Sequence, residues 1–316
     1  MKSGELLSAA SRPDGDLPSR RRDFFVKLVR LGTRGSPLAL VQAGMVRDTL
    51  IAAHGTEVEI VVIRTTGDAV QDRPLAEIGD KALWTKELDR ALLGGDIDIA
   101  VHSMKDVETV RPEAITIAAM LPRADVRDRL IGASSIADLP DGAVVGTSSP
   151  RRRAQLLRLR PDLRVVSFRG NVDTRLAKLA AGEADATLLA AAGLARLGRP
   201  DVGAPIELDV MLPAPAQGAV GIEARTGDHR VHAMLSVLDH ASTHVAVLTE
   251  RALLAALHAG CHSPVAALAG TNGVIRAELL AEDGSAHVTG SGDDPAALAR
   301  DLLARAPQNV RELFAA

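Results

Sequence analysis

A short apolar strand that runs directly into the start of a helix is the feature that most limits what this chain can fold into. The strand pattern at 144–146 leads into Thr-Ser-Ser-Pro-Arg-Arg-Arg at 147–153, where Ser149 is a good N-cap and Pro150 a good first helical residue. The same order, Gly-Thr at a strand end and Ser-Pro at a helix start, occurs at 32–37. Two similar α/β domains facing each other across a cleft would explain this repetition, and a chance likeness of six residues is the alternative.

The turn at 147–153 is suited to binding anions. Free backbone N–H groups, the positive end of the helix and the guanidinium groups of Arg151 and Arg152 can converge there. Guanidinium groups bind carboxylate or phosphate in two-point contacts. A second strand also ends at a helix start beside Arg169 and Arg175. The alternative is that these arginines lie on a solvated helix face.

The length and composition bound the class of protein, because 316 residues exceed the usual size of one core and predict two or three domains. Hydrophobic residues make up 47% and charged residues 24%, which is a globular profile. One Trp, four Phe and no Tyr argue against base-stacking platforms for single-stranded nucleic acid. The net charge is −3, so the arginines form local clusters and non-specific DNA binding is not expected.

Cys261 is the only cysteine, which excludes an internal disulfide and a site built from several cysteines. It indicates a reducing compartment, and we expect a cytoplasmic protein. No apolar run has the length of a membrane span, so no membrane partner is expected. Residues 1–26 lack the apolar middle of a signal peptide, and their acidic residues argue against a transit peptide, so we expect a disordered N-terminal extension.

Between Lys27 and about Leu212, short β-branched runs alternate with helical patterns, which is typical of a parallel-sheet α/β architecture. The predicted strands are 27–32, 57–64, 97–101, 115–120, 143–147, 164–168 and 185–189. The stretch 211–219 has the composition of a linker, and the apolar run 219–224 after it could return to the first sheet. Crossings of this kind would form a hinge.

The C-terminal part is predicted to be a smaller α+β domain. Its expected elements are a helix at 242–257, strands at 265–269 and 274–280, and a last helix near 295–305. Gly260 is placed to end the first helix, and Cys261 lies in the turn beyond it, where a thiol can be presented. The expected domains are therefore 27–121 with 214–240, 122–213 and 241–316.

The segment 97–107 leaves a buried strand and brings His102, Ser103, Lys105 and Asp106 in quick succession. Catalytic groups favour strand ends in open α/β sheets. Lys105 and Asp106 point to different sides of an extended turn, so one can hold an anion while the other faces a cation. The alternative is a surface ion pair, and His102 alone is better explained as a structural histidine.

At these positions the chain resembles the porphobilinogen deaminases, also called hydroxymethylbilane synthases, over nearly all of residues 28–270. The matching motifs, in the family's order, are Arg34-Gly35-Ser36-Pro37-Leu38-Ala39-Leu40, Val101-His102-Ser103-Met104-Lys105-Asp106, Gly146-Thr147-Ser148-Ser149, Arg169-Gly170-Asn171, Thr174-Arg175-Leu176, Gln217-Gly218-Ala219 and Gly260-Cys261.

The resemblance implies a transferase that deaminates four porphobilinogen molecules, joins them head to tail on a covalent dipyrromethane cofactor and releases hydroxymethylbilane, in the biosynthesis of haem, chlorophyll and corrins. It implies a three-domain fold like that of periplasmic binding proteins, and a thioether from the cofactor to one cysteine, here Cys261. Each porphobilinogen carries an acetate and a propionate, so a chain growing from two rings to six gathers twelve carboxylates and needs an arginine-dense cleft. A monomer acting on a small-molecule substrate, without nucleic acid, is expected.

The resemblance also implies roles for single residues. Asp106 matches the family's carboxylate beside the pyrrole nitrogens, which stabilises the azafulvene cation formed when porphobilinogen loses ammonia. The positions that match cofactor-binding residues are Lys105, Thr147, Ser149, Arg151, Arg152 and Arg175. Those that match substrate-binding residues are Arg34, Ser36, Gln42, Arg169 and Arg196. No metal is expected.

The chain departs from the family at 79–84, where it has Gly-Asp-Lys-Ala-Leu-Trp in place of the common Gly-Gly-Lys-Gly-Leu-Phe, and at Ala216 and Ala259, where Gly is usual. The first group belongs to a mobile loop over the cleft in the family, so its missing glycines would alter lid mobility without removing a catalytic group. Arg153 matches no family role and is interpreted as a surface charge.

Two other functions fit parts of the sequence. A non-catalytic two-lobed module for a small anion would use the same arginines, but it gives no reason for Cys261 after a helix end or for Lys105 and Asp106 at a strand end. A phosphate-ligand enzyme would need a Gly-x-x-x-x-Gly-Lys-Ser/Thr loop or a Gly-x-Gly-x-x-Gly turn, and neither occurs. His229 and His232 have an i, i+3 spacing that surface histidines explain better than a metal site.

Overall fold

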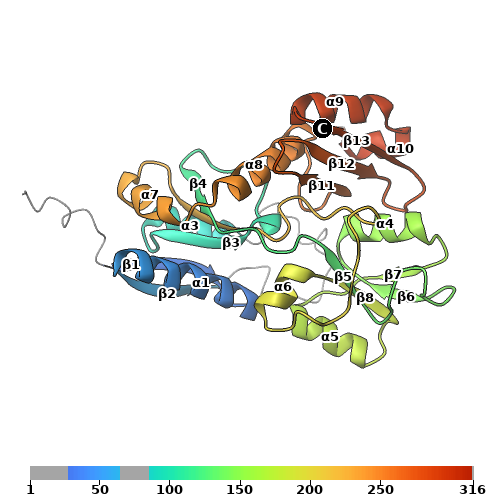
Figure 1. Cartoon of the computed structure of the whole chain (residues 1–316), viewed down its shortest axis with the longest axis horizontal. Helices are drawn as coiled ribbons and strands as arrows, with labels where there is room; N and C mark the ends of the chain where they lie inside the picture. The colour runs from blue at the N-terminus through green and yellow to red at the C-terminus, as the bar shows by residue number, and fades with distance from the viewer. Residues whose placement is uncertain (1–27, 65–84, 315–316) are drawn as a thin grey trace, which may run out of the picture.

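The computed structural model describes residues 28–64 and 85–314, which form two α/β domains side by side and a smaller C-terminal domain packed against both (Figure 1). The strands form three sheets, two of five strands and one of three. The expected extension at 1–26 and the departure from the family at 79–84 lie outside the described residues.

The first sheet has the strand order β2-β1-β3-β10-β4. Its strands are β1 (Leu28–Arg34), β2 (Glu57–Ile63), β3 (Ile99–Ser103), β4 (Ile115–Met120) and β10 (Val220–Arg225). β1 pairs in parallel with β2 and β3, and β10 runs antiparallel between β3 and β4. The prediction that the run after the linker returns to the first sheet is therefore confirmed by β10.

Helices cover both faces of this sheet. α1 (Pro37–His54), α7 (His229–Leu235) and the 3-10 turn η3 (Ser236–Leu238) pack on one face, and α3 (Lys86–Gly94) packs on the other. α1 begins as predicted, because the Ser36 hydroxyl accepts a hydrogen bond from the Ala39 N–H and Pro37 is the first residue. It ends at Gly55, whose φ of 61° is a left-handed conformation that glycine adopts at little cost.

The second sheet has the order β7-β6-β8-β5-β9. Its strands are β5 (Asp128–Ile131), β6 (Val144–Gly146), β7 (Arg164–Val166), β8 (Ala186–Ala190) and β9 (Ala204–Pro205), and its helices are α4 (Pro150–Leu159), α5 (Val172–Ala180) and α6 (Ala191–Arg196). β6 pairs in parallel with β7 and β8, whereas β5 is antiparallel to β8 and β9.

The two α/β domains repeat one arrangement. Each has three parallel strands beside an antiparallel strand that enters directly from the other domain, β10 in the first sheet and β5 in the second. The helix starts at Ser36 and Ser149 occupy equivalent places after the central strands β1 and β6. The parallel architecture predicted between Lys27 and about Leu212 is therefore wrong for β5, because the crossing of the chain between domains sets its direction. No direction was predicted for β10, which is antiparallel for the same reason.

The C-terminal domain is a three-stranded antiparallel sheet with helices packed on it. Its elements are α8 (Ala241–Ala256), β11 (Val265–Ala269), β12 (Ile275–Leu280), β13 (His287–Gly292), α9 (Pro295–Arg305), α10 (Gln308–Arg311) and the 3-10 turn η4 (Glu312–Phe314). The predicted strand at 265–269 and helix at 295–305 are confirmed. The domain touches both α/β domains, since α8 packs against β4 and α4 packs against β12 (Figure 1).

Candidate active site

A cleft of about 610 Å³ opens where the two α/β domains meet the turn after α8. Twelve of the thirteen predicted site residues line it. They are Arg34, Ser36, Gln42, Lys105, Asp106, Ser149, Arg151, Arg152, Arg169, Arg175, Arg196 and Cys261. Thr147 is the thirteenth, and it is buried in the turn before α4, where its hydroxyl accepts a hydrogen bond from the Ser149 N–H at 3.2 Å.

The lining of this cleft is strongly positive. Within residues 28–64 and 85–314 it contains nine arginine or lysine side chains and one carboxylate, that of Asp106, although the whole chain has a net charge of −3. Arg64 and Arg251 are the two cations that the sequence did not predict. A lining of this composition suits a ligand that carries several carboxylates.

The first α/β domain contributes the end of β1 and the start of α1. Arg34 is the last residue of β1, and Ser36 caps α1 two residues later. Gln42 is buried, and its Nε2 donates a hydrogen bond to Ser103 Oγ at 2.8 Å. Since Ser103 ends β3, this bond brings the start of α1 next to the turn that follows β3.

α4 carries the arginines that the sequence predicted to hold anions. Its first residue is Pro150, and the Ser149 hydroxyl accepts a hydrogen bond from the Arg152 N–H at 3.4 Å, as predicted. Arg151 and Arg152 are only 3% and 5% exposed, which excludes the solvated-face interpretation for both. Arg153 is exposed, in agreement with the surface charge expected of it.

Asp128, on β5, holds Arg151 and Arg152 in place. Each guanidinium donates to a different oxygen of this carboxylate at 2.7 Å, and Gln217 Nε2 donates to it at 2.8 Å. Burial opposes the ionisation of Asp128, but the two arginines keep its pKa well below the usual range. The Nε–H groups of both arginines are buried and donate to no group in the described part of the chain. One carboxylate shared by two arginines therefore leaves donors and positive charge for a ligand.

Arg175 and Arg169 add further positive charge on the same side. The Asn171 side chain caps α5 and so places Arg175 in its first turn, where Arg175 Nε donates to the Gly170 carbonyl at 3.0 Å. Burial, together with the nearby Arg152, lowers the pKa of Arg175 to about 10. One buried guanidinium nitrogen of Arg169 has no partner among the described residues. An anion bound here would satisfy both side chains.

A 3-10 turn, η2 (Met104–Asp106), follows β3 and presents Lys105 and Asp106 to the cleft. Lys105 Nζ lies 3.5 Å from the side-chain oxygen of Gln217. Burial, with Arg152 nearby, lowers the pKa of Lys105 to about 8, so this side chain is still mainly charged at neutral pH. Both residues are half-buried in the lining, which does not support a surface ion pair.

Asp106 is close enough to Lys105, Arg175 and Cys261 for its charge to affect the pKa of each of them. Cys261 is exposed on the open side of the cleft, in the turn after α8. The neighbouring protein atoms remove water from around its sulfur, and this desolvation is the main cause that raises the pKa of the thiol to about 11. The negative charges of Asp106 and Glu108 contribute less in the same direction. The thiol is therefore protonated at neutral pH and has a carboxylate near it.

His102 has the surroundings of a structural histidine. It is buried, and its Nε2 lies 3.0 Å from a carboxylate oxygen of Glu223 on β10. Arg111 Nε binds the other oxygen of Glu223 at 2.8 Å. Burial opposes the ionisation of Glu223, but His102 and Arg111 lower its pKa to about 2. These residues lie outside the cleft lining and support the strand that leads to η2.

Three residues that shape the site were not predicted from the sequence. Asp128 lies in β5, a strand of four residues that is too short for a periodic pattern. Arg64 directly follows β2, and its position at a strand end was the available signal. Arg251 is a buried charged residue on the apolar face of α8, and a charge at such a position was the signal there.

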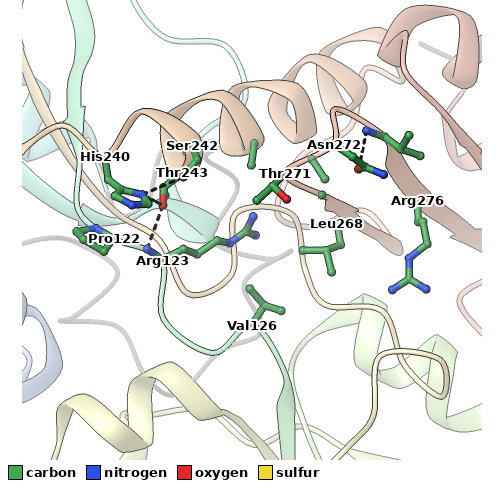
Figure 2. A pocket seen from close by; sticks show the side chains of 14 residues that line it. Pro122, Arg123, Val126, His240, Ser242, Thr243, Leu268, Thr271, Asn272 and Arg276 are labelled. Carbon is green, nitrogen blue, oxygen red and sulfur yellow. Dashed lines mark hydrogen bonds between the residues drawn. The ribbon is translucent and has the colours of Figure 1, made fainter.

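A second cavity, of about 520 Å³, lies where the crossing segment 122–126 meets α8 and β11 (Figure 2). It contains none of the predicted site residues. Arg123 is bound there by Glu250 at 2.7 Å, and the Thr243 hydroxyl accepts a hydrogen bond from the Arg123 N–H at 3.0 Å. These polar groups hold the domains together, so we place the chemistry in the first cleft.

His229 and His232 lie on α7, and the sequence also predicted a helix there. The His232 ring contacts the Arg225 carbonyl at 3.0 Å. In residues 28–64 and 85–314, no three His, Cys, Asp or Glu side chains are grouped as metal ligands. No helix in those two ranges has the length and apolar character to span a bilayer.

Two family models match the chain. "Porphobilinogen deaminase, dipyromethane cofactor binding domain" matches residues 29–233, and "Porphobilinogen deaminase, C-terminal domain" matches residues 244–306. The porphobilinogen deaminase of Sphingopyxis alaskensis is 57% identical over 304 residues, which cover 91% of this chain and 96% of that protein. The porphobilinogen deaminase of Paracoccus denitrificans is 51% identical over 296 residues, with 88% and 95% covered.

Solved structures give weaker similarities. A periplasmic substrate-binding protein of an ABC transporter from Coxiella burnetii has a TM-score of 0.43 at 15% identity, with 68% of this chain and 93% of that chain covered. A putative methionine-binding lipoprotein from Bacillus subtilis has a TM-score of 0.41 at 13% identity, with 69% and 92% covered. Scores this low carry no conclusion about function.

Proposed function

Because the chain belongs to the porphobilinogen deaminase family, we propose that its arginine-lined cleft is the site where porphobilinogen is polymerised. The protein is an enzyme of tetrapyrrole biosynthesis, a transferase that acts on the small molecule porphobilinogen with a dipyrromethane cofactor. The observation that carries the proposal is the meeting of nine cationic side chains, the carboxylate of Asp106 and the single cysteine of the chain in one cleft.

The residues of the cleft fit a dipyrromethane that carries acetate and propionate groups. The Nε–H groups of Arg151 and Arg152 are buried and have no partner among the described residues, and they are donors of the kind that carboxylates accept. We assign cofactor binding to six residues, called here the cofactor wall, with Thr147 shaping the turn before α4. The assigned residues are Lys105, Thr147, Ser149, Arg151, Arg152 and Arg175. When bound, the cofactor supplies the pyrrole ring to which the first substrate molecule is joined.

The incoming substrate is assigned to lining residues from both α/β domains. The residues are Arg34, Ser36, Gln42, Arg169 and Arg196, all in the lining. At an effective dielectric near 20, a pair of unit charges about 4 Å apart is worth roughly 4 kcal/mol, so each arginine can offset the repulsion between neighbouring carboxylates. Arg196 also donates to the Gly218 carbonyl at 2.7 Å, which holds it beside the stretch 211–219 that crosses back to the first domain.

Asp106 is assigned the chemical step. Loss of ammonia from porphobilinogen leaves positive charge shared between the methylene carbon and the pyrrole nitrogen of the substrate. An oxygen of Asp106 can accept a hydrogen bond from the pyrrole N–H and stabilise that charge as it develops. Lys105, charged at neutral pH, is placed to hold a cofactor carboxylate beside it.

We propose Cys261 as the point of covalent attachment, through a thioether. It is the one cysteine of the sequence, and its turn opens on the cleft that Asp106 lines. The pKa of about 11 keeps its sulfur protonated at neutral pH. Asp106, whose charge reaches Cys261, is the group placed to take that proton when the carbon–sulfur bond forms.

The three sheets support the domains proposed from the sequence, 27–121 with 214–240, 122–213 and 241–316. We further propose a monomer in the cytoplasm that binds neither nucleic acid nor membrane. The single cysteine and the net charge of −3 support this proposal. A non-catalytic binding module for an anion is the competing function, and the enzymes at 51% and 57% identity argue against it.

Intact-mass spectrometry of the purified protein tests this function. We expect the mass to exceed that of the sequence by two porphobilinogens less two ammonias. Cys261→Ser should lack the addition, while Ser263→Ala, a change in the same turn that keeps the thiol, should retain it. A fully active protein with the unmodified mass would overturn the proposed attachment.

A further inference from the structure

Arg251 reaches from α8 in the C-terminal domain to the backbone that follows Asp106. Its guanidinium donates to three consecutive carbonyl oxygens, those of Val107 at 3.2 Å, Glu108 at 2.5 Å and Thr109 at 3.0 Å. The side chain is 6% exposed and lies in the cleft lining. In the described ranges no carboxylate is within ion-pair distance of Arg251, so these backbone carbonyls are its main partners.

The three carbonyls belong to a stretch that has no strand partner. β3 ends at Ser103 and β4 begins at Ile115, so the sheet does not fix the backbone at 107–109. A guanidinium has five N–H donors in a rigid plane and can replace the missing strand contacts. Arg251 therefore fixes the backbone directly after Asp106.

Thr109 makes a second contact between the same two turns. Its hydroxyl donates to the carbonyl oxygen of Ala259 at 2.7 Å. Ala259 is buried and lies two residues before Cys261. The backbone segment that Arg251 holds is therefore bonded in turn to the segment that carries the cysteine.

We infer that Arg251 and Thr109 set the position of Asp106 relative to Cys261. They act through other residues and are positioning residues. Asp106 and Cys261 belong to different domains, so without direct contacts between their turns the distance between them would depend on the docking of whole domains. The inference rests on the roles proposed above for Asp106 and Cys261.

The competing explanation is that these contacts only dock the C-terminal domain onto the rest of the protein. α8 offers a matched control for it. Thr243, near the start of α8, makes two hydrogen bonds through its hydroxyl (Figure 2). One, with His240 Nδ1 at 2.8 Å, is local, and the other, accepted from the backbone N–H of Arg123 at 3.0 Å, ties α8 to the crossing segment 122–126. Thr109 likewise joins the C-terminal domain to its neighbour through one hydroxyl, but next to the turn of Cys261. Removing either hydroxyl should weaken docking, whereas only Thr109 should affect the position of Asp106.

The test compares Thr109→Val, Thr109→Ser and Thr243→Val as cofactor-bearing enzymes by intact mass, thermal unfolding and steady-state kinetics. We expect Thr109→Val to keep the cofactor mass and KM but to lower kcat about tenfold or more, because misplacing a reacting group by about 1 Å can cost about a hundredfold in rate. Thr109→Ser keeps the hydroxyl and should stay within about twofold of wild type on the same reasoning. Thr243→Val removes two hydroxyl contacts, so it should lower Tm at least as much as Thr109→Val does, and it should leave kcat unchanged.

Three results would overturn the inference: an unchanged kcat in Thr109→Val, equal kcat losses in Thr109→Val and Thr243→Val, or a rise in KM alone, which would indicate direct substrate contact. Should Thr109→Val fail to fold, Arg251→Lys carries the same test, because it keeps the charge without the planar fork. A silent Thr109→Val beside an inactive Asp106→Asn rejects the positioning role alone. A fully active Asp106→Asn rejects the proposed function instead.

Discussion

Replacing Asp128 by Asn should destabilise the cofactor-free protein strongly. The carboxylate is buried and accepts one hydrogen bond from each of Arg151 and Arg152 at 2.7 Å. With charge centres about 4 Å apart and an effective dielectric near 20, each pair is worth roughly 4 kcal/mol. Part of this is offset because the variant no longer buries a charged carboxylate, and breaking buried pairs typically costs about 3–5 kcal/mol. We expect a loss of that size in the free energy of unfolding.

The assay is urea denaturation followed by circular dichroism, carried out on Cys261→Ser protein so that no cofactor is attached. Asp162→Asn is the matched control, because Asp162 also accepts two hydrogen bonds from one arginine, Arg160, at 2.8 and 2.7 Å, but its side chain is 40% exposed. Exposed pairs add little to stability, so this control should stay close to its parent. Equal stability of the two variants would refute the argument that Asp128 holds Arg151 and Arg152 in place.

The remaining predictions concern other charged residues of the cleft. Because the pKa of Lys105 is about 8, its charge is lost as the pH rises through 8, and assembly of the cofactor should slow there in the wild type but not in Lys105→Arg. The assay follows the gain of protein mass over time in porphobilinogen at several pH values. Identical pH profiles of the assembly rate in the two proteins would contradict this prediction. Because that pKa is lower in the folded than in the unfolded chain, the cofactor-free fold should also gain stability from about pH 8 to about pH 10.4. Arg152→Leu should fold without acquiring the cofactor mass, whereas Arg169→Leu should acquire it and lose turnover; normal cofactor content in Arg152→Leu would remove Arg152 from the cofactor wall.

Much of the fold could be predicted because the relevant signals are local. Ser36 and Ser149 cap helices in the structure as their sequence contexts predict, because a Ser followed by Pro favours a helix start wherever it occurs. The antiparallel β5 and β10 could not be oriented in this way. Their direction depends on two crossings between domains, and such long-range pairing leaves no mark on a run of four to six residues.

The site shows the same division. The motifs placed Arg151 and Arg152 correctly in the cleft, but not their burial or their shared partner Asp128, which lies on a strand of a different part of the chain. The contact from Arg251 to the backbone after Asp106 was also beyond prediction. It depends on how α8 docks, and a charge on the apolar face of a helix does not indicate which group it contacts.

The rate of Asp106→Asn tests the central claim most directly. Asn keeps the size of the side chain and removes its charge, so the variant should fold normally. Loss of a carboxylate that stabilises a developing cation should cost roughly 3 kcal/mol or more of barrier, which is about a hundredfold in rate. Formation of hydroxymethylbilane per cofactor-bearing molecule, followed as uroporphyrin after acid oxidation, is predicted to fall by at least that factor. A rate within about threefold of wild type, less than about 1 kcal/mol, would contradict the account and remove Asp106 from the mechanism.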